Sequence, residues 1–378
     1  MVYLDYNATT PVHPAVLEAF LPFYTERFGN PSSIHWAGRM VREAVESARE
    51  QVARLANCDP GEVVFTSCGS EADNMAIKGV AAALRHKGNH IVTARTEHPA
   101  VVNSCLYLEQ LGWRITWLPA DRDGLVSLDD LEESLTDQTV LIALMAANNE
   151  TGTLLPVAGI GKIAARHRIY FLCDAVQALG KVPVDFKGSG ATFMALSGHK
   201  IGAPKGIGAL VVRKGSKLYP MIHGGSQERN RRAGTENVAG IVAFGAACVL
   251  AGDMLSTEME RLGQLRDRLE QGIMAAVDGV QLNGHPLLRL PNTLNLSFAG
   301  VGADSLLFNL DQQGIAAASG SACSSGTLKA SPVLAAMGVD PQWAQGAIRF
   351  SLGLQTTAED IVLVLDLLPD LVRRLRST

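Results

Sequence analysis

Short apolar runs that alternate with helix-like segments constrain the fold of this 378-residue chain more than any other feature. Over the first two-thirds of the chain, the apolar runs predict strands and the segments between them show helical periodicity. Strands that are apolar along their whole length are typical of a parallel sheet covered by helices on both faces. We therefore predict an α/β fold whose large domain holds a mainly parallel seven-stranded sheet, with strands at 62–66, 90–94, 113–118, 140–146, 170–174, 192–196 and 209–212.

The C-terminal third has a different pattern and predicts a smaller α+β unit. The length of the chain exceeds what one hydrophobic core usually organises, so two domains are expected. We place the large domain at 12–250 and the small domain at 1–11 together with 251–378. Two long helices are predicted to bridge the domains, at 241–250 and 259–277, and the small domain is expected to contain strands at 293–298 and 347–352 and a last helix at 358–374.

Composition argues against several functional classes. The net charge is −4 with a pI near 6.2, and no basic stripe is present, so nucleic-acid binding is not expected. No apolar stretch of about 18 residues stands out and the N-terminus lacks a secretory pattern, so we expect a cytoplasmic protein without a membrane span. The six cysteines form no C-x-x-C pair and there is no H-E-x-x-H, so reduced thiols and no metal site are expected.

Polar side chains follow five of the predicted strands at the point where each strand ends. Ligands of open α/β sheets bind beyond the carboxyl ends of the strands. We therefore expect a site where these segments meet, at 67–71, 97–98, 148–150, 174 and 197–200.

Lys200 lies between a predicted strand and the glycine-rich turn 202–208. A lysine in that place can form an imine with an aldehyde such as that of pyridoxal phosphate. Asp174 ends an apolar strand, where a carboxylate needs a partner such as a protonated pyridine nitrogen, or else caps a helix. Gln177, about one turn later, could hydrogen-bond a ring hydroxyl. The turn 202–208 matches neither a P-loop nor a dinucleotide fingerprint.

Two further strand ends carry groups that suit the same cofactor. Gly69 and Ser70 begin a helix, where backbone N–H groups and a hydroxyl could bind a phosphate; the alternative is an ordinary serine N-cap. His98 could stack on an aromatic ring and move protons near neutral pH, or it could be structural.

Two groups in the small domain complete the candidate site. Cys323 lies in the small, polar segment 318–326 and could be a nucleophilic thiol or a free surface thiol. Arg349 lies inside an apolar strand, where a guanidinium requires an anion. That anion could be a substrate carboxylate or a structural acidic partner.

With these residues in view, the chain resembles the cysteine desulfurases, which are pyridoxal-phosphate enzymes of the aminotransferase-like fold type I. The resemblance runs nearly end to end. The cysteine segment and the run 231–237 are similar to the branch that serves iron–sulfur assembly, including nitrogenase maturation. The matching runs are 3–10, 28–33, 65–74, 97–100, 148–152, 174–177, 198–200, 227–229, 231–237 and 319–326.

The resemblance implies a role for each candidate residue. Lys200 forms the imine with the cofactor, Cys323 receives the sulfur of L-cysteine, and His98 stacks on the ring. Arg349 and Asn149 bind the substrate. The other cofactor-binding residues implied are Gly69, Ser70, Asn149, Asp174, Gln177, Ser197, His199 and, from the second subunit of a homodimer, Thr235. The products implied are L-alanine and an enzyme persulfide, whose sulfur passes to an acceptor or iron–sulfur scaffold protein.

Other functions remain open at this point. A selenocysteine lyase would use similar residues, a small-amino-acid transaminase would need no nucleophilic thiol, and a silent scaffold of sulfur assembly would not need an intact site. One position departs from the family pattern, because Leu354 stands where arginine is usual after the run 349–353. This departure affects local contacts and not the proposed chemistry.

Overall fold

A computed structural model describes residues 1–320 and 331–377 and contains the predicted seven-stranded sheet. Its strand order is β2-β8-β7-β6-β5-β3-β4. Neighbours from β4 to β7 pair in parallel, whereas β8 is antiparallel to both β2 and β7. The prediction of a mainly parallel α/β sheet is confirmed. The strands are β2 (Val63–Thr66), β3 (His90–Ala94), β4 (Arg114–Leu118), β5 (Thr139–Met145), β6 (Tyr170–Asp174), β7 (Phe193–Ser197) and β8 (Gly208–Val212).

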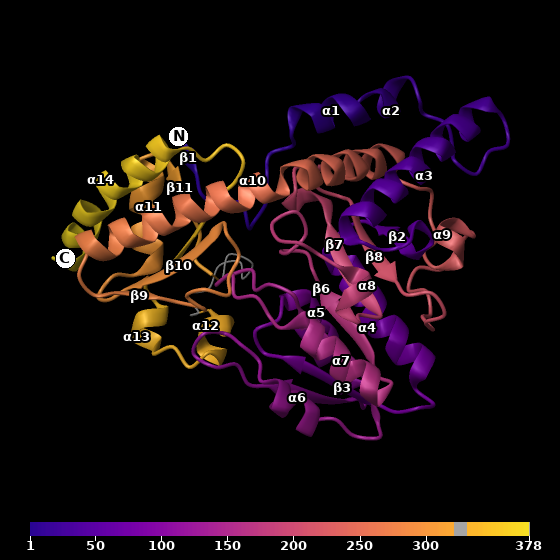
Figure 1. Cartoon of the computed structure of the whole chain (residues 1–378), viewed down its shortest axis with the longest axis horizontal. Helices are drawn as coiled ribbons and strands as arrows, with labels where there is room; N and C mark the ends of the chain where they lie inside the picture. The colour runs from indigo at the N-terminus through magenta and orange to yellow at the C-terminus, as the bar shows by residue number, and fades with distance from the viewer. Residues whose placement is uncertain (321–330, 378) are drawn as a thin grey trace.

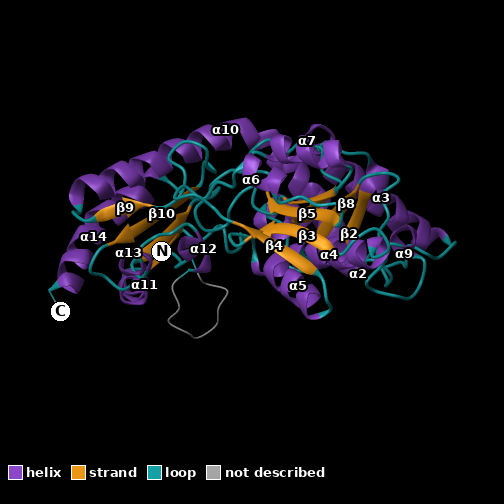
Figure 2. Ribbon diagram, turned by 90° about the horizontal axis from the view of Figure 1, so that it is seen from below, coloured by secondary structure: helices purple, strands orange, loops and turns teal. Residues whose placement is uncertain are grey.

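Helices cover both faces of this sheet (Figure 2). Side chains alternate between the faces of a strand, so in β5 Leu141 packs into one apolar cluster and Ile142 into the other. One cluster is completed by α4 (Gly69–Leu84) and α5 (Pro99–Gln110). The opposite cluster is completed by α3 (Trp36–Ala56), α7 (Val157–His167) and the first half of α10 (Val238–Ala276). A ligand site is therefore expected beyond the carboxyl ends of the strands, where open α/β sheets bind their ligands.

A smaller unit is built on a three-stranded antiparallel sheet, β12-β10-β9. Its apolar cluster includes side chains from the end of α10, from α11 and from α14. The opening segment joins this unit because β1 pairs in parallel with β11. The elements are β1 (Val2–Tyr3), β9 (Val280–Leu282), β10 (Thr293–Phe298), β11 (Ile315–Ala316), β12 (Ala347–Ser351), α11 (Ala303–Gln312), α12 (Pro332–Ala336), α13 (Pro341–Ala344) and α14 (Ala358–Arg376).

The remaining short elements lie around the larger sheet. They are α1 (Pro14–Phe20), α2 (Pro22–Thr25), α6 (Leu128–Glu133), α8 (Phe186–Ser189), α9 (Gln227–Asn230) and the 3₁₀ helices η1 (Pro60–Glu62) and η2 (Gly198–Lys200).

The prediction of two bridging helices was wrong, because α10 is one helix of 39 residues. It runs along both units in Figure 1. Residues 251–258 include glycine, serine and threonine, which weaken a helix, but no proline to end it. The domain boundary predicted near residue 250 falls inside α10 and stays a prediction.

By length and composition α10 could also cross a membrane, which the search for apolar runs overlooked. Half of its most apolar window is buried inside the protein. The first half of α10 packs in the core of the larger unit, as a core helix does.

Candidate active site

Three ionisable side chains meet beyond the carboxyl ends of β3, β6 and β7: His98, Asp174 and Lys200. Asp174 is the last residue of β6 and is buried. Burial raises the pKa of its carboxyl, while the neighbouring His98 and Lys200 oppose that rise. One carboxylate oxygen accepts the Val176 N–H at 2.9 Å. A cation beyond the strand end would stabilise the ionised form.

His98 is the N-cap of α5, and its Nδ1 accepts the Ala100 N–H at 3.1 Å. Burial lowers the pKa of the imidazole; Asp174 opposes this change and Lys200 adds to it. Because Nδ1 is an acceptor, the neutral ring carries its proton on Nε2. The helix start therefore fixes both the ring and its tautomer.

Two buried carboxyls lie near Asp174: Glu97, which the sequence analysis placed among the converging strand ends, and Asp73, which it did not single out. Asp73 on α4 and Glu97 after β3 are each almost fully buried. Burial raises the pKa of both well above the ordinary range, and Asp174 raises both further. Glu97 accepts the Met145 N–H at 2.9 Å. Burial therefore disfavours the charged form of both carboxyls, whereas His98 and Lys200 favour the charged form of Asp174. Two features of the sequence indicate these carboxyls: Glu97 directly precedes His98, and Asp73 lies about one turn into α4.

The start of α4 is a helix N-terminus, a feature that suits an anion. Cys68, not Ser70, is the N-cap: its sulfur accepts the Glu71 N–H at 3.4 Å. The serine-cap alternative is therefore wrong, and the exposed Ser70 hydroxyl is not needed for capping. Gly69 is required by close packing, because a Cβ there would lie 2.7 Å from Val176 Cγ2 and 3.5 Å from Ser197 Cβ. Ser70 and Ser197 are thus brought to one place.

Ser197 flanks this place from the end of β7, and His199 follows two residues later in η2. The Ser197 hydroxyl is buried and has no hydrogen-bond partner within the described part of the chain. His199 Nδ1 lies 3.1 Å from Thr9 Oγ1. Burial lowers the pKa of His199 to about 4, and the neighbouring lysines Lys200, Lys205 and Lys181 contribute. A neutral imidazole and two hydroxyls suit a phosphate that already meets a helix N-terminus.

Asn7 connects several candidate residues and was not singled out from the sequence. Its backbone oxygen accepts Gln177 Nε2 at 3.0 Å and Lys200 Nζ at 2.6 Å. Its side-chain oxygen accepts Lys181 Nζ at 2.9 Å, and Lys181 also donates to Gln177 Oε1 at 2.7 Å. These bonds fix the Gln177 amide with Nε2 as a donor. Burial lowers the pKa of Lys181 well below its usual range, and Lys200 and Arg349 contribute.

Arg349 is the strand arginine of β12 and is almost fully buried. Its Nη2 donates to Asp5 Oδ1 at 2.7 Å, so the alternative of a structural acidic partner is realised. Its Nη1 donates to the Asn149 backbone oxygen at 2.9 Å. Both Arg349 Nε and Asn149 Oδ1 are buried without a hydrogen-bond partner in the described residues. The guanidinium therefore keeps its Nε–H for a further acceptor.

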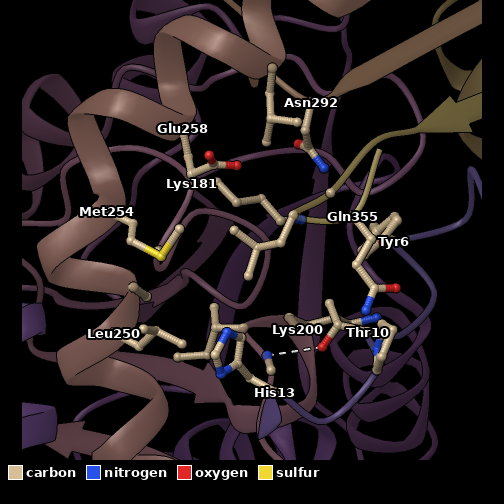
Figure 3. Close-up of a pocket in the computed structure, with 18 of the residues that line it drawn as sticks. Tyr6, Thr10, His13, Lys181, Lys200, Leu250, Met254, Glu258, Asn292 and Gln355 are labelled. Carbon is tan, nitrogen blue, oxygen red and sulfur yellow. Dashed lines mark hydrogen bonds between the residues drawn. The ribbon is translucent and has the colours of Figure 1, made fainter. Parts of the chain in front are cut away.

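Lys200 also lines a cavity of about 120 Å³ between α10 and the opening segment (Figure 3). Its Nζ donates to the backbone oxygens of Asn7 and Ala8 at 2.6 and 2.8 Å. Leu250, Met254 and Glu258 of α10 form one wall of this cavity. Leu354 lies on the same cavity, so the side chain that departs from the family pattern adds apolar surface here.

One predicted residue lies apart from this group. Thr235 is exposed between α9 and α10, on a second cavity that it shares with Ser67 and Gly206. Cys323 lies outside the described residues. Within the described ranges, no group of three or more histidine, cysteine or acidic side chains could hold a metal ion.

The residues present fit pyridoxal phosphate by the chemistry of their donors and acceptors. Asp174 suits a protonated ring nitrogen, and the start of α4 with Ser70, Ser197 and His199 suits a phosphate. The partnerless Ser197 hydroxyl, Asn149 Oδ1 and Arg349 Nε are buried polar atoms that require a ligand or water. Lys200 supplies the amine.

Comparison with known proteins agrees with this chemistry. Residues 2–364 match the family described as aminotransferase class-V. The chain is 50% identical over 376 residues to "Cysteine desulfurase IscS" of Dictyoglomus turgidum, covering all of this chain and 95% of that protein. It is 48% identical to the protein of the same description from Methanosarcina thermophila, covering all of this chain and 93% of that protein.

Comparison with solved structures indicates the same family. A "NifS-like protein" superposes with a TM-score of 0.93 at 37% identity, covering 99% of both chains. "SspA in complex with cysteine" superposes with a TM-score of 0.83 at 34% identity, covering 93% of this chain and 99% of that one. The chain therefore belongs to the aminotransferase class-V family, within its group of cysteine desulfurases.

Proposed function

We propose that this protein is a pyridoxal-phosphate-dependent cysteine desulfurase that takes the sulfur of L-cysteine onto Cys323 and releases L-alanine. Family membership supports the proposal. The observation that carries it is a set of buried, partnerless polar atoms on Asn149, Ser197 and Arg349. Hydrogen bonds through Asn7 join Asn149 and Arg349 to Lys200, and Ser197 ends the strand that pairs with the strand of Asp174. Such atoms are costly unless a ligand satisfies them.

Pyridoxal phosphate, when bound, supplies an aldehyde for amines and a ring that accepts electrons from the substrate carbon. Lys200 would hold the aldehyde, Asp174 the ring nitrogen, and His98 would lie against the ring. Gln177, oriented by Asn7 and Lys181, would donate to the ring hydroxyl. The phosphate would be held by the start of α4 with the hydroxyls and imidazole named above, and by Thr235 of a second subunit.

The residues of this chain then divide the work on L-cysteine. Arg349 and Asn149 bind the carboxylate, and Lys200 removes the α-proton as a general base. The Cys323 thiolate attacks the substrate sulfur, so an S–S bond forms and the C–S bond breaks. The electron pair stays with the substrate carbon, which takes up a proton and leaves as alanine. The persulfide on Cys323 passes its sulfur to an acceptor protein of iron–sulfur assembly.

A homodimer is part of the proposal and is supported by an exposed apolar segment at the start of the chain. Tyr24, Phe28, Ile34 and Trp36 are each more than half exposed, and the apolar Tyr219 is exposed as well. Exposed apolar surface of this extent is typical of subunit interfaces. A cytoplasmic location is supported by the cysteines, since the five in the described residues are all free thiols.

The direct test is incubation of the purified protein with L-cysteine and a reductant, with alanine and sulfide measured together. We expect equal amounts of both products. Replacement of Cys323 by serine should abolish the persulfide but keep the visible absorption of the cofactor. Normal sulfide release from that variant would reject the mechanism, because sulfur would then leave without the thiol.

A further inference from the structure

Glu150 contacts both ends of the segment that carries Cys323, although no role in the reaction falls to it. The Ser331 hydroxyl donates to Glu150 Oε2, and Gly320 packs so closely that a Cβ there would overlap the same carboxyl oxygen. Gly320 and Ser331 are the described residues on either side of 321–330. One oxygen of one carboxyl therefore meets both ends of this segment.

Glu150 is itself held by residues of both units. Its carboxyl is buried, its N–H donates to Asn148 Oδ1 at 2.9 Å, and its backbone oxygen accepts Asn295 Nδ2 at 3.1 Å. It follows Asn149 directly in sequence, and Asn149 accepts the Arg349 guanidinium. The carboxyl thus has a fixed position relative to the proposed substrate-binding residues.

Other hydrogen bonds also hold the residues at the two ends of this segment. Ala318, two residues before Gly320, exchanges backbone hydrogen bonds of 3.1 and 2.6 Å with Arg349. Ser331 is the N-cap of α12, since its hydroxyl also accepts the Leu334 N–H at 3.1 Å. A hydroxyl that caps one helix and donates to one carboxyl has its direction fixed.

Burying a carboxyl costs free energy unless its contacts compensate for that cost. Burial raises the pKa of Glu150 to about 7, while the Ser331 hydrogen bond and Arg349 lower it. An apolar side chain could fill the same space without the cost of burying a carboxyl. Packing alone therefore does not explain a hydrogen-bond acceptor at this place.

We propose that Glu150 is a positioning residue that holds Gly320 and Ser331 in place and so sets where the Cys323 thiol meets the substrate sulfur. The inference rests on the proposed function, because it assigns Cys323 the sulfur. It predicts that Glu150 acts on sulfur transfer and not on binding of the cofactor or removal of the α-proton.

The test compares holoenzyme variants in two assays. One assay follows the gain of one sulfur atom on Cys323 by mass spectrometry in a single turnover. The other follows exchange of the α-proton of L-cysteine in D2O, which requires Lys200 but not the thiol. For Glu150→Ala and Ser331→Ala we expect sulfur gain to slow about tenfold or more, since small misplacements of reacting groups have large effects on rate. The exchange rate and the visible absorption should match the unmodified enzyme.

Conservative variants and a double variant separate positioning from general damage. Glu150→Gln keeps an acceptor oxygen for Ser331, and Ser331→Thr keeps the donor, so both should restore most of the rate. Glu150→Ala with Ser331→Ala should be no slower than either alone, because both changes remove the same hydrogen bond. As a readout without turnover, trypsin should cleave after Lys329 faster in Glu150→Ala than in the unmodified holoenzyme.

Each contrary result has a distinct meaning. If sulfur gain and proton exchange fall together, or if sulfur gain is unchanged in Glu150→Ala, the positioning role is overturned and the proposed function stands. If the unmodified enzyme gains no sulfur on Cys323, the proposed function fails and the inference fails with it.

Discussion

The ionisation of Glu150 gives a prediction that can be measured without any activity assay. Burial raises the pKa of this carboxyl from 4.5 to about 7, against the opposing effects of Ser331 and Arg349. A span of about 2.5 pH units, at about 1.4 kcal/mol each, corresponds to about 3 kcal/mol of ionisation free energy. The side chain is 4% exposed, so solvent screening removes little of this value.

The sign follows from proton linkage. The folded state binds the Glu150 proton more tightly than the unfolded state does. Stability from this group is therefore complete below pH 4.5 and is lost as the pH rises through 7. Glu150→Gln cannot ionise. We expect the free energy of unfolding of the variant, relative to the unmodified protein, to increase by about 2 to 3 kcal/mol between pH 5 and pH 8.

Urea unfolding of the holoenzyme at several pH values, followed by tryptophan fluorescence, measures this difference. Other titrating groups cancel because the two proteins differ at one position. Glu43→Gln, on the exposed face of α3, is the matched control and should show no such pH dependence. A difference for Glu150→Gln that stays flat from pH 5 to pH 8 would show that burial does not raise the pKa of Glu150.

Three further predictions concern the framework of the site. Burial, with a contribution from Arg114, lowers the pKa of His90 to about 4. The stabilising contribution of His90 is therefore present above pH 6.5 and is lost as the pH falls toward 4. In urea unfolding, His90→Gln should reduce the loss of stability at acid pH by up to about 3 kcal/mol, and an unchanged pH profile would contradict this. Gly69→Ala should weaken cofactor retention at least about tenfold in dialysis followed by visible absorption, because its Cβ meets Val176, and full retention would show that the turn can move. Glu228→Ala leaves the buried Arg49 without its bidentate partner and should lower the free energy of unfolding by about 3 to 5 kcal/mol, whereas a loss below about 1 kcal/mol would argue against a stabilising pair.

Much of the larger sheet could be predicted from sequence because its signals are local. An apolar strand followed by a polar residue marks both the strand and its carboxyl end, so β3 and β6 were predicted at their observed bounds. Asp174 and Lys200 were found by the same rule. The Gly69 turn was found because a glycine before a helix start has few other uses.

What the sequence did not indicate depends on contacts between distant parts of the chain. Asn7 meets Gln177 and Lys181 across about 170 positions, and Arg349 meets Asp5 across 344. No periodicity reports such pairs. The single long helix α10 was missed because weak helix formers at 251–258 suggested an end that packing against both units overrides.

The central claim is that one amine holds the cofactor and one thiol receives the sulfur. Borohydride reduction of the holoenzyme, followed by peptide mass spectrometry, measures the first, and mass analysis after L-cysteine measures the second. We expect the cofactor mass on Lys200 and one added sulfur atom on Cys323. Cofactor attached to Lys181 or Lys205, or sulfur gained on a cysteine other than Cys323, would contradict the account.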